Sequence, residues 1–191
     1  MKEELLYKNF QSKINLSEKE FEHVVSKFKF SIVEKKEKFL CPGDYTDHIA
    51  FVKKGVLRSY EIDQKGNENV LQLAFEDHWT SDLRSFILRS QSKIYVETIE
   101  DSELLLLSHA NLEKLYADVP KIERFFRKLY EKAYVHSQER IQTALHVPAD
   151  QRYQNILEHY PDVIQRVPLV YIASYLGITP ESLSRIRRKV S

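Results

Sequence analysis

The side chains with the clearest capacity for recognition lie together near the C-terminus. Arg185 offers a planar guanidinium fork that matches the O6 and N7 acceptors of guanine. Glu181 lies about one helical turn earlier and can accept a hydrogen bond from the N4 amino group of cytosine, and Ser182 is suited to a base or a phosphate. The other residues suited to contact phosphates are Thr179, Ser184, Arg188 and Lys189. These residue types predict a surface that binds double-stranded DNA.

The residues around this cluster predict two short helices joined by a tight turn. Gly177 is expected to end the first helix, because a helix end commonly needs a residue that tolerates positive φ. Thr179 is the expected N-cap of the second helix, with Pro180 at its first position and Leu183 and Ile186 on its buried side. The apolar residues of the first helix have helical spacing and are Leu169, Ile172, Ala173 and Leu176. This layout is typical of a helix-turn-helix DNA-binding unit.

A simpler interpretation of the same residues is a solvated helix face. Glu181 and Arg185 would then form an ordinary i,i+4 ion pair, which contributes a few tenths of a kcal/mol to helix stability. Against this, the cap, the glycine, the apolar pattern and a basic end with Arg187 to Lys189 all agree with a DNA-binding helix. The overall net charge is only +1, so this local clustering carries the electrostatic argument.

The composition limits the other function classes. A hydrophobic content of 42% over 191 residues is enough for a core, in one large domain or two small ones. No stretch approaches the roughly 20 apolar residues of a membrane span, and the N-terminus has no signal-peptide pattern. We therefore expect a cytoplasmic protein with no membrane partner.

The residues that could bind metals or perform covalent catalysis do not form recognisable motifs. Cys41 is the single cysteine, which excludes an internal disulfide, a cysteine-based zinc site and a four-cysteine iron–sulfur cluster. The seven histidines include His48, which has no partner at His-x-His spacing. A nucleophile elbow and a phosphate loop are also missing from the sequence. We expect no catalytic residues, no metal and no cofactor.

The element pattern predicts an α+β fold. Residues 28–108 form short apolar or alternating runs between turns at Gly43, Gly55 and Gly66, which is typical of an antiparallel β-roll or jelly roll. A short helix is expected near 81–88, and Ser17 to Glu20 has capping-box spacing. The predicted domains are a β-roll over 1–118, a long helix over 119–146 and a helix-turn-helix domain over 147–191.

The long helix carries apolar residues at spacings of three and four for about five turns. One interpretation is a helix packed on its own β-roll, and the other is a dimerisation helix shared by two copies. Because aromatic residues crowd its early turns, we favour the dimer. The predicted seam consists of Ile122, Phe125, Phe126, Leu129, Ala133 and His136.

Taken in order, these features resemble the Crp–Fnr transcription regulators over nearly the whole chain. The resemblance rests on Gly43-Asp44, residues 51–58, residues 63–66 and residues 172–186. It implies a cyclic-nucleotide-binding-like β-roll and a homodimer that binds a roughly palindromic operator through Glu181 and Arg185. It also implies RNA polymerase as a candidate partner and an unknown small-molecule effector. Pro180 replaces the family's first reading arginine, so one contact is expected to be missing.

The ligand region departs from the family pattern. Members that bind cyclic nucleotides carry a Phe-Gly-Glu run followed by Arg-Ser/Thr-Ala, whereas residues 78–83 and 91–96 lack the glycine, the glutamate and the phosphate-binding arginine. Burying a phosphate without its cation costs several kcal/mol. We therefore expect no tight binding of cyclic AMP.

Two alternative functions come from other classes. One is a small-molecule sensor or protein-interaction module whose helical tail does not bind DNA, an interpretation that Pro180 and the few residues after the second helix favour slightly. The other is a metal-dependent barrel enzyme, which the scattered histidines do not support.

Overall fold

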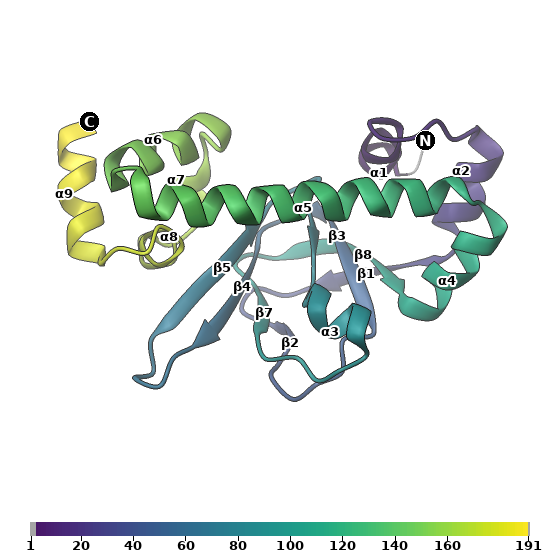
Figure 1. Cartoon of the computed structure of the whole chain (residues 1–191), viewed down its shortest axis with the longest axis horizontal. Coiled ribbons are helices and arrows are strands. Elements are labelled where there is room, and N and C mark those ends of the chain that lie inside the picture. The colour runs from purple at the N-terminus through teal and green to yellow at the C-terminus, as the bar shows by residue number, and fades with distance from the viewer. Residues whose placement is uncertain (1–2, 191) are drawn as a thin grey trace.

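The computed structural model describes residues 3–190, without the side chain of Val190. Within that range nine helices and eight strands form (Figure 1). Their order is α1 (Glu4–Gln11), α2 (Glu18–Val25), β1 (Phe28–Val33), β2 (Lys38–Leu40), β3 (His48–Lys54), β4 (Leu57–Ile62), β5 (Glu68–Ala74), β6 (Trp79–Thr80), α3 (Leu83–Leu88), β7 (Tyr95–Thr98), β8 (Ser102–Ser108), α4 (His109–Asp118), α5 (Lys121–His146), α6 (Ala149–His159), α7 (Val163–Arg166), α8 (Leu169–Tyr175) and α9 (Pro180–Val190).

The strands form two antiparallel four-stranded sheets, called here the β-roll (residues 28–108). Their strand orders are β1-β8-β3-β6 and β2-β7-β4-β5. The two inner faces enclose small and branched apolar side chains, which pack closely between facing sheets. These side chains are Val33, Leu40, Ala50, Val52, Leu57, Ala74, Val96, Leu104 and Leu106. The predicted combination of antiparallel sheets and helices is confirmed, and α3 occupies the short helical segment expected near 81–88.

The N-terminal helices and the start of α5 cover the outer face of the β1-β8-β3-β6 sheet. The predicted capping box begins α2, because Ser17 Oγ accepts from the Glu20 N–H at 3.3 Å and Glu20 Oε2 accepts from the Ser17 N–H at 2.8 Å. Strand and helix residues meet there in one core. Its buried members are Leu6, Phe10, Ile14, Leu16, Phe21, Val24, Ile49, Phe51, Phe86, Leu105, Leu107, Leu112, Leu115, Val119, Ile122, Phe125 and Phe126.

The long helix α5 has two distinct halves. Ile122, Phe125 and Phe126 are at most 1% exposed, and the ring of Phe125 lies 4.2 Å from that of Phe10 between centroids. These three residues, expected in a dimer seam, therefore belong to the core of their own chain. Beyond the half-buried Leu129, every residue from 131 to 139 is exposed. The helix meets the β-roll again at Arg140, which donates to the Leu71 carbonyl of β5, so the outward side of its second half is exposed.

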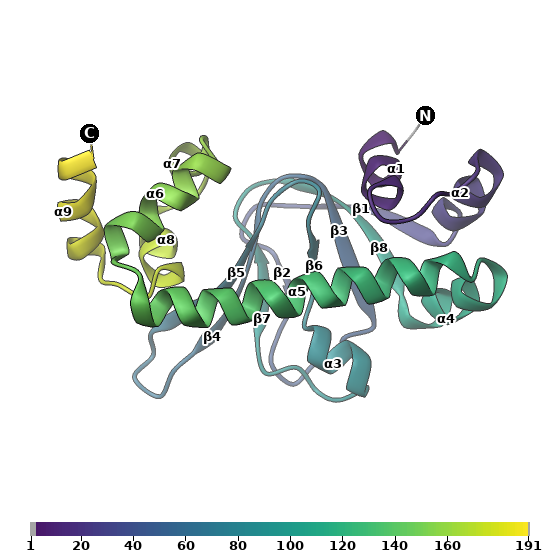
Figure 2. The same ribbon diagram turned by 45° about the horizontal axis from the view of Figure 1, so that its top comes forward.

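The helices α6–α9 (residues 149–190), called here the tail, lie at the far end of α5 from α1, α2 and α4 (Figures 1 and 2). The tail packs on the outer face of the β2-β7-β4-β5 sheet. The buried residues of this contact are Val56, Tyr60, Val70, Leu73, Phe75 and Ile99 from the β-roll, with Tyr153, Val163, Val167, Ile172, Ala173, Leu176 and Leu183 from the tail. None of the described helices is long and apolar enough to cross a membrane.

Candidate nucleic-acid interface

The turn between α8 and α9 is built as the local sequence predicts. Gly177 adopts a φ of +67°, and its N–H donates to the Ser174 carbonyl at 2.9 Å. The Ile178 N–H reaches back to the Ala173 carbonyl at 3.0 Å. This pair of bonds satisfies the last carbonyls of α8 and needs a left-handed residue, which glycine provides without steric cost. The turn therefore sets a defined angle between α8 and α9.

The start of α9 is capped by Thr179. Its hydroxyl oxygen accepts from the Ser182 N–H at 3.3 Å, and its carbonyl accepts from the Leu183 N–H at 3.0 Å. Leu183 is 1% exposed and joins the tail core, with Ile186 partly buried beside it. The predicted cap and the predicted inward face of α9 are thus both present. Because the inward face is anchored, the opposite face is held out toward solvent.

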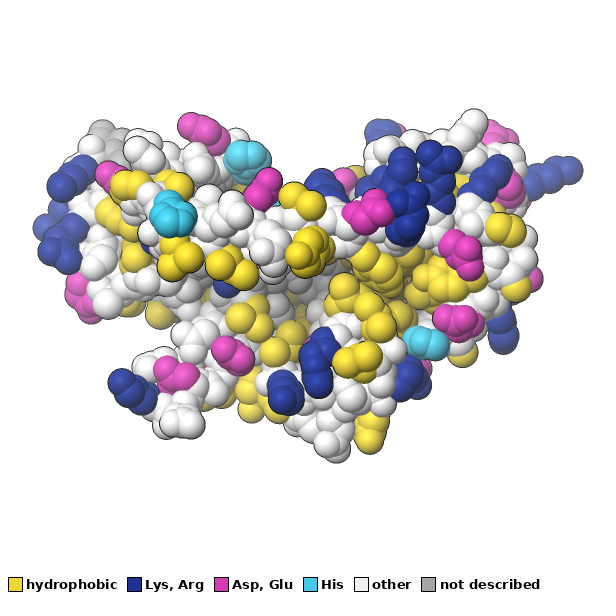
Figure 3. Space-filling model, viewed as in Figure 1, with side chains coloured by type: hydrophobic (Ala, Val, Ile, Leu, Met, Phe, Trp, Pro, Cys, Tyr) yellow, Lys and Arg dark blue, Asp and Glu magenta, His cyan; other side chains and the backbone are white. Residues whose placement is uncertain are grey.

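The seven predicted recognition residues share this outer end of the molecule. Thr179, Glu181, Ser184, Arg185, Arg188 and Lys189 are exposed, and Ser182 is partly buried. Figure 3 shows the basic side chains of α9 gathered at the end of the tail. Arg185 Nη2 donates to Ser182 Oγ at 3.2 Å. The Glu181 backbone N–H and the Thr179 hydroxyl lower the pKa of Glu181, so the carboxylate is ionised and can accept hydrogen bonds at neutral pH.

Arg152 connects the end of the long helix to this unit. Its Nε donates to the carbonyl of Val147, just after α5, at 3.2 Å. Its Nη1 donates to the carbonyl of Leu176, at the end of α8, at 2.6 Å. One side chain thus ties the C-terminal ends of α5 and α8 together through carbonyls that have no helical partner.

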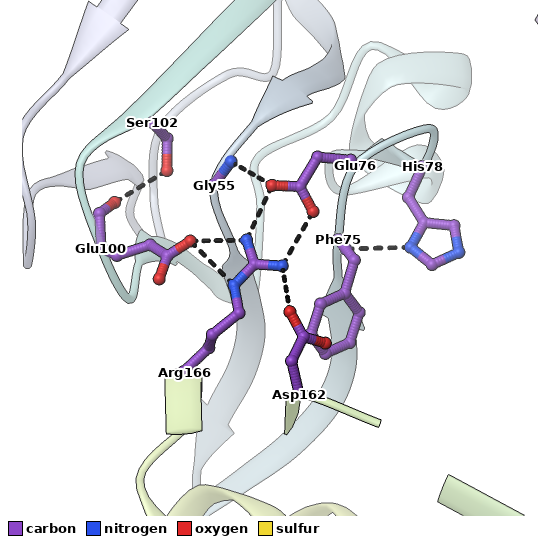
Figure 4. Close-up of polar contacts among 8 residues, drawn as sticks. All are labelled: Gly55, Phe75, Glu76, His78, Glu100, Ser102, Asp162 and Arg166. Carbon is purple, nitrogen blue, oxygen red and sulfur yellow. Dashed lines mark hydrogen bonds and ion pairs between the residues drawn. The ribbon is translucent and has the colours of Figure 1, made fainter. Parts of the chain in front are cut away.

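A charged cluster joins the tail to the β-roll at α7 (Figure 4). Arg166 Nη2 lies 2.7 Å from Glu76 Oε1 and 2.6 Å from Glu100 Oε1, and Nη1 contacts Asp162 Oδ2 at 3.2 Å. The Gly55 N–H donates to Glu76 Oε1 at 2.8 Å. Burial by itself would raise the pKa of Glu76, but the hydrogen bonds from Arg166 and Gly55 outweigh it and lower that pKa. Hydrogen bonds to Glu76, opposed by burial, raise the pKa of Arg166 above its ordinary value. Arg166 and Glu76 are therefore both ionised at neutral pH.

A second arginine lies beneath α8. The Arg58 guanidinium carbon is 3.7 Å from the ring centroid of Tyr171 and 4.0 Å from that of Tyr60. Its Nη2 donates to Glu97 at 3.1 Å, and Nη1 pairs with Glu68. With only 3% of its side chain exposed, Arg58 is a buried cation that is compensated by two carboxylates and two aromatic faces.

Sequence reasoning missed both arginine contacts. Arg166 is 66 residues from Glu100 and 90 residues from Glu76 along the chain. No spacing rule links charged residues that are so far apart in sequence. The only sequence signal was the position of Arg166 in the last turn before Val167 and Pro168, and that position is equally typical of a solvated helix end.

The two segments that lack the family's nucleotide-binding residues, residues 78–83 and 91–96, are linked by the protein's own polar groups. Buried Asp82 caps α3 by accepting from the Ser85 N–H at 3.0 Å. Its second oxygen accepts from the Ser92 hydroxyl at 2.9 Å. The nearby loop 43–48 borders a surface pocket of about 510 Å³. Within residues 3–190, no group of three or more His, Cys, Asp or Glu side chains is arranged to hold a metal ion.

The exposed half of α5 carries apolar side chains that the predicted seam did not include. Tyr134, Ile141 and Leu145 are 66%, 55% and 74% exposed, and their spacings of seven and four place them on one helix face. Ala133 and His136, which the sequence did assign to a seam, are exposed on the same half. Figure 3 shows apolar side chains along this part of α5.

Comparison with known proteins finds one matching family model and several solved structures of similar fold. Residues 32–118 match the family model of the cyclic nucleotide-binding domain. The catabolite activator protein of Thermus thermophilus superposes with a TM-score of 0.61 at 17% identity, covering 92% of this chain and 84% of that chain.

Two further solved structures are similar over most of their length. FixK2 from Bradyrhizobium japonicum gives a TM-score of 0.73 at 16% identity, covering 85% of this chain and 84% of its own. The c-di-GMP responsive global regulator CLP of Xanthomonas campestris gives 0.70 at 16% identity and covers 91% of both chains. No curated protein sequence matches the chain. At these identities the structural likeness shows the fold alone, which this chain shares with the three proteins named above.

Proposed function

We propose that this protein is a homodimeric DNA-binding transcription regulator of the Crp–Fnr type. The observation that carries the proposal is the pairing of a capped, inwardly anchored α9 with an outward face of polar and basic residues. Such a helix fits the major groove, which admits one α-helix and exposes distinct hydrogen-bonding patterns for each base pair. The proposed helix-turn-helix domain covers residues 147–191 and includes the tail.

The exposed residues of α9 divide into two roles. Glu181, Ser182 and Arg185 lie in its first two turns and supply base contacts, with Arg185 directed to guanine and Glu181 to cytosine. In the free protein Arg185 is held by Ser182 Oγ, so reading guanine requires this 3.2 Å contact to open or to be shared. The residues assigned to phosphates are Thr179, Ser184, Arg188 and Lys189.

The dimer is proposed to form through the second half of α5. Tyr134, Ile141 and Leu145 form its apolar stripe, with Ala133 and His136 close by. Exposed apolar side chains along a helix that no other element covers are the expected signature of a partner helix. A two-fold axis along this seam would present two copies of α9 to half-sites about one helical turn, roughly 34 Å, apart. The operator is therefore expected to be roughly palindromic.

The β-roll is proposed as a sensor or partner domain that does not use cyclic AMP. A phosphate entering beside α3 would face the buried Asp82 carboxylate, which repels it, and would have to displace the Ser92 hydroxyl. The effector would then be another small molecule, and RNA polymerase is a candidate protein partner.

Selection of bound sequences from random duplex DNA tests the proposed function. The expected result is an enriched, roughly palindromic sequence, bound with an affinity that falls as salt rises because phosphate contacts release counterions. Arg185→Ala should cost about 1–3 kcal/mol at one base pair and relax the preference there.

Arg127→Ala provides the matched control. It removes an exposed arginine that pairs with Glu131 on α5, remote from α9, so operator binding should be unchanged. Failure to enrich any sequence would contradict the proposal and support a sensor or interaction module whose tail does not bind DNA. An Arg185→Ala variant with the parent's sequence preference would show that Arg185 does not read a base.

A further inference from the structure

We infer that Arg166 is a positioning residue that fixes the direction of α9 by clamping the tail to two carboxylates of the β-roll. The inference builds on the proposed function, because it identifies what sets the geometry of the DNA-binding helices. It concerns the contact drawn in Figure 4, where the guanidinium of Arg166 lies among Glu76, Glu100 and Asp162.

The geometry of the clamp is specific. The guanidinium meets Glu76 with both terminal nitrogens, Nη2 to Oε1 at 2.7 Å and Nη1 to Oε2 at 3.0 Å. It meets Glu100 with Nη2 at 2.6 Å and with Nε at 3.2 Å, both to Oε1. Bidentate pairing of a planar fork fixes orientation as well as distance, which a single ammonium group does not do. The clamp therefore restrains α7 in both position and rotation.

The carboxylates come from rigid parts of the β-roll. Glu76 follows β5 and is held by the Gly55 N–H, and Glu100 lies in the short turn between β7 and β8. Arg166 is 22% exposed at its side chain, and the two glutamates are 34% and 32% exposed. Partial burial reduces solvent screening compared with a surface pair. The clamp is therefore a stronger restraint than the exposed Arg127–Glu131 pair on α5, whose side chains are 60% and 56% exposed.

The restraint passes from α7 to α9 through α8. Two residues after Arg166, Pro168 begins the turn into α8, where Ser174 Oγ accepts from the Val70 N–H at 2.9 Å and donates to the Glu68 carbonyl at 2.7 Å. Tyr171 on the same helix lies over Arg58. Since α8 is fastened to β5 and joined to α9 by a defined turn, the clamp and these contacts orient α9 while leaving its outer face free.

This arrangement has a consequence for a dimer. With α5 forming the seam, the separation of the two α9 helices depends on how firmly each tail is held on its own β-roll. A tail that loses the Arg166 contact would keep its apolar contact with the β-roll, but its direction would be less firmly fixed. Such a variant should bind operators while tolerating altered half-site spacing.

The first experiment measures tail position without DNA. Nitroxide labels are placed at Lys93→Cys on the β-roll and Gln154→Cys on α6, both exposed, in a Cys41→Ser background, and the pair distance is measured by double electron–electron resonance. The parent should give one narrow distribution between the labels of one chain. Arg166→Gln and Arg166→Glu should broaden it, and Arg166→Glu combined with Glu100→Arg should restore it.

Control variants separate positioning from general stability. Arg127→Gln should leave the distribution narrow, and circular dichroism should show the helical content of every variant to be that of the parent. Arg166→Lys keeps the charge but loses the fork, so a distribution wider than the parent's is expected. If Arg166→Gln and Arg166→Lys both keep the parent's narrow distribution, Arg166 does not position the tail.

The second experiment uses the selected operator with one base pair added to or removed from the spacing between half-sites. The parent should discriminate against both altered spacings, and Arg166→Gln should lose most of that discrimination while keeping base preference within each half-site. If the parent binds no DNA, the proposed function fails, and the distance measurement alone still decides whether Arg166 holds the tail. Unaltered discrimination in a variant with a broadened distribution would contradict the link from the clamp to α9.

Discussion

The Ser92 hydroxyl donates a 2.9 Å hydrogen bond to the buried carboxylate of Asp82 and so joins residues 78–83 to residues 91–96, the two segments that lack the family's nucleotide-binding residues. The other Asp82 oxygen is used by the N–H of Ser85 at the start of α3. This small network is satisfied internally, so an entering anion would break it and gain no cation in return.

Cyclic AMP should therefore not bind with micromolar affinity. The expected outcome of a calorimetric titration with cyclic AMP is dilution heat only, together with an unchanged melting temperature, because a ligand that does not bind the folded state cannot stabilise it. Heat that saturates at micromolar cyclic AMP would show that the Asp82–Ser92 network opens to admit a phosphate.

The exposed stripe on α5 should control the oligomeric state. Ile141→Asp places a charge in the proposed apolar seam, so sedimentation velocity should show a shift from dimer to monomer, because an unpaired buried charge is strongly disfavoured. Ile32→Asp is the matched control, since Ile32 is equally apolar and 71% exposed, but lies on β1. A dimer that persists in the Ile141→Asp protein would rule out this seam.

His78 should make the folded protein less stable in acid. Its Nδ1 accepts from the Phe75 N–H at 2.9 Å, and its Nε2 lies 3.3 Å from the Tyr160 hydroxyl on the tail. Burial, with smaller contributions from Lys132 and His136, lowers the pKa of His78 despite the opposing charge of Asp77.

Because the folded-state pKa lies below the unfolded value of about 6.5, the unfolded chain binds more protons in acid. The contribution of neutral His78 to the free energy of unfolding is fully present above that unfolded-state pKa. It is lost as the pH falls from there toward the folded-state pKa. Urea unfolding from about pH 7.5 to 5.5 should show this loss, and His78→Gln should reduce its slope. A slope unchanged in His78→Gln would assign the effect to other groups.

Gly55 should not tolerate a side chain. Its φ is +103°, and a Cβ there would lie 2.2 Å from Ser102 Oγ and 2.9 Å from the Ser102 Cα. Gly55→Ala should cost roughly 1–3 kcal/mol of unfolding free energy, and the tail contact should weaken because the Gly55 N–H holds Glu76. Gly66→Ala, with a φ of +83° and open space around the glycine, should cost less in the same denaturant titration.

Much of the local structure could be predicted from short stretches of sequence. The glycine turn at Gly177, the Thr179 cap and the capping box at Ser17 each depend on residues within four or five positions of one another. The strands of the β-roll could also be predicted from the sequence, because their alternating apolar runs are bounded by glycine turns. The exposed face of α9 followed from the same helical periodicity.

Periodicity could not decide what the long helix packs against. Phe125 and Phe126 have the spacing of a dimer seam, but they are buried by Phe10, Trp79 and the rest of the core around α1. An apolar stripe indicates only that one face of the helix is buried. Which element covers that face depends on how segments distant in sequence pack together. The apolar residues left for a partner are Tyr134, Ile141 and Leu145, which are exposed along the second half of the helix.

By itself, the sequence determined the elements, their caps and turns, and the residues that α9 exposes, since these depend on backbone preferences and neighbours along one helix or hairpin. Only the tertiary structure decided how the tail is held. Arg166 pairs with Glu100, which is 66 residues away in the sequence, and Tyr171 lies over Arg58. Both contacts form because the tail packs on the outer face of the β2-β7-β4-β5 sheet. Hydrogen bonds and cation–π contacts act over a few ångströms, so pairs distant in sequence exist only after the β-roll and the tail have packed.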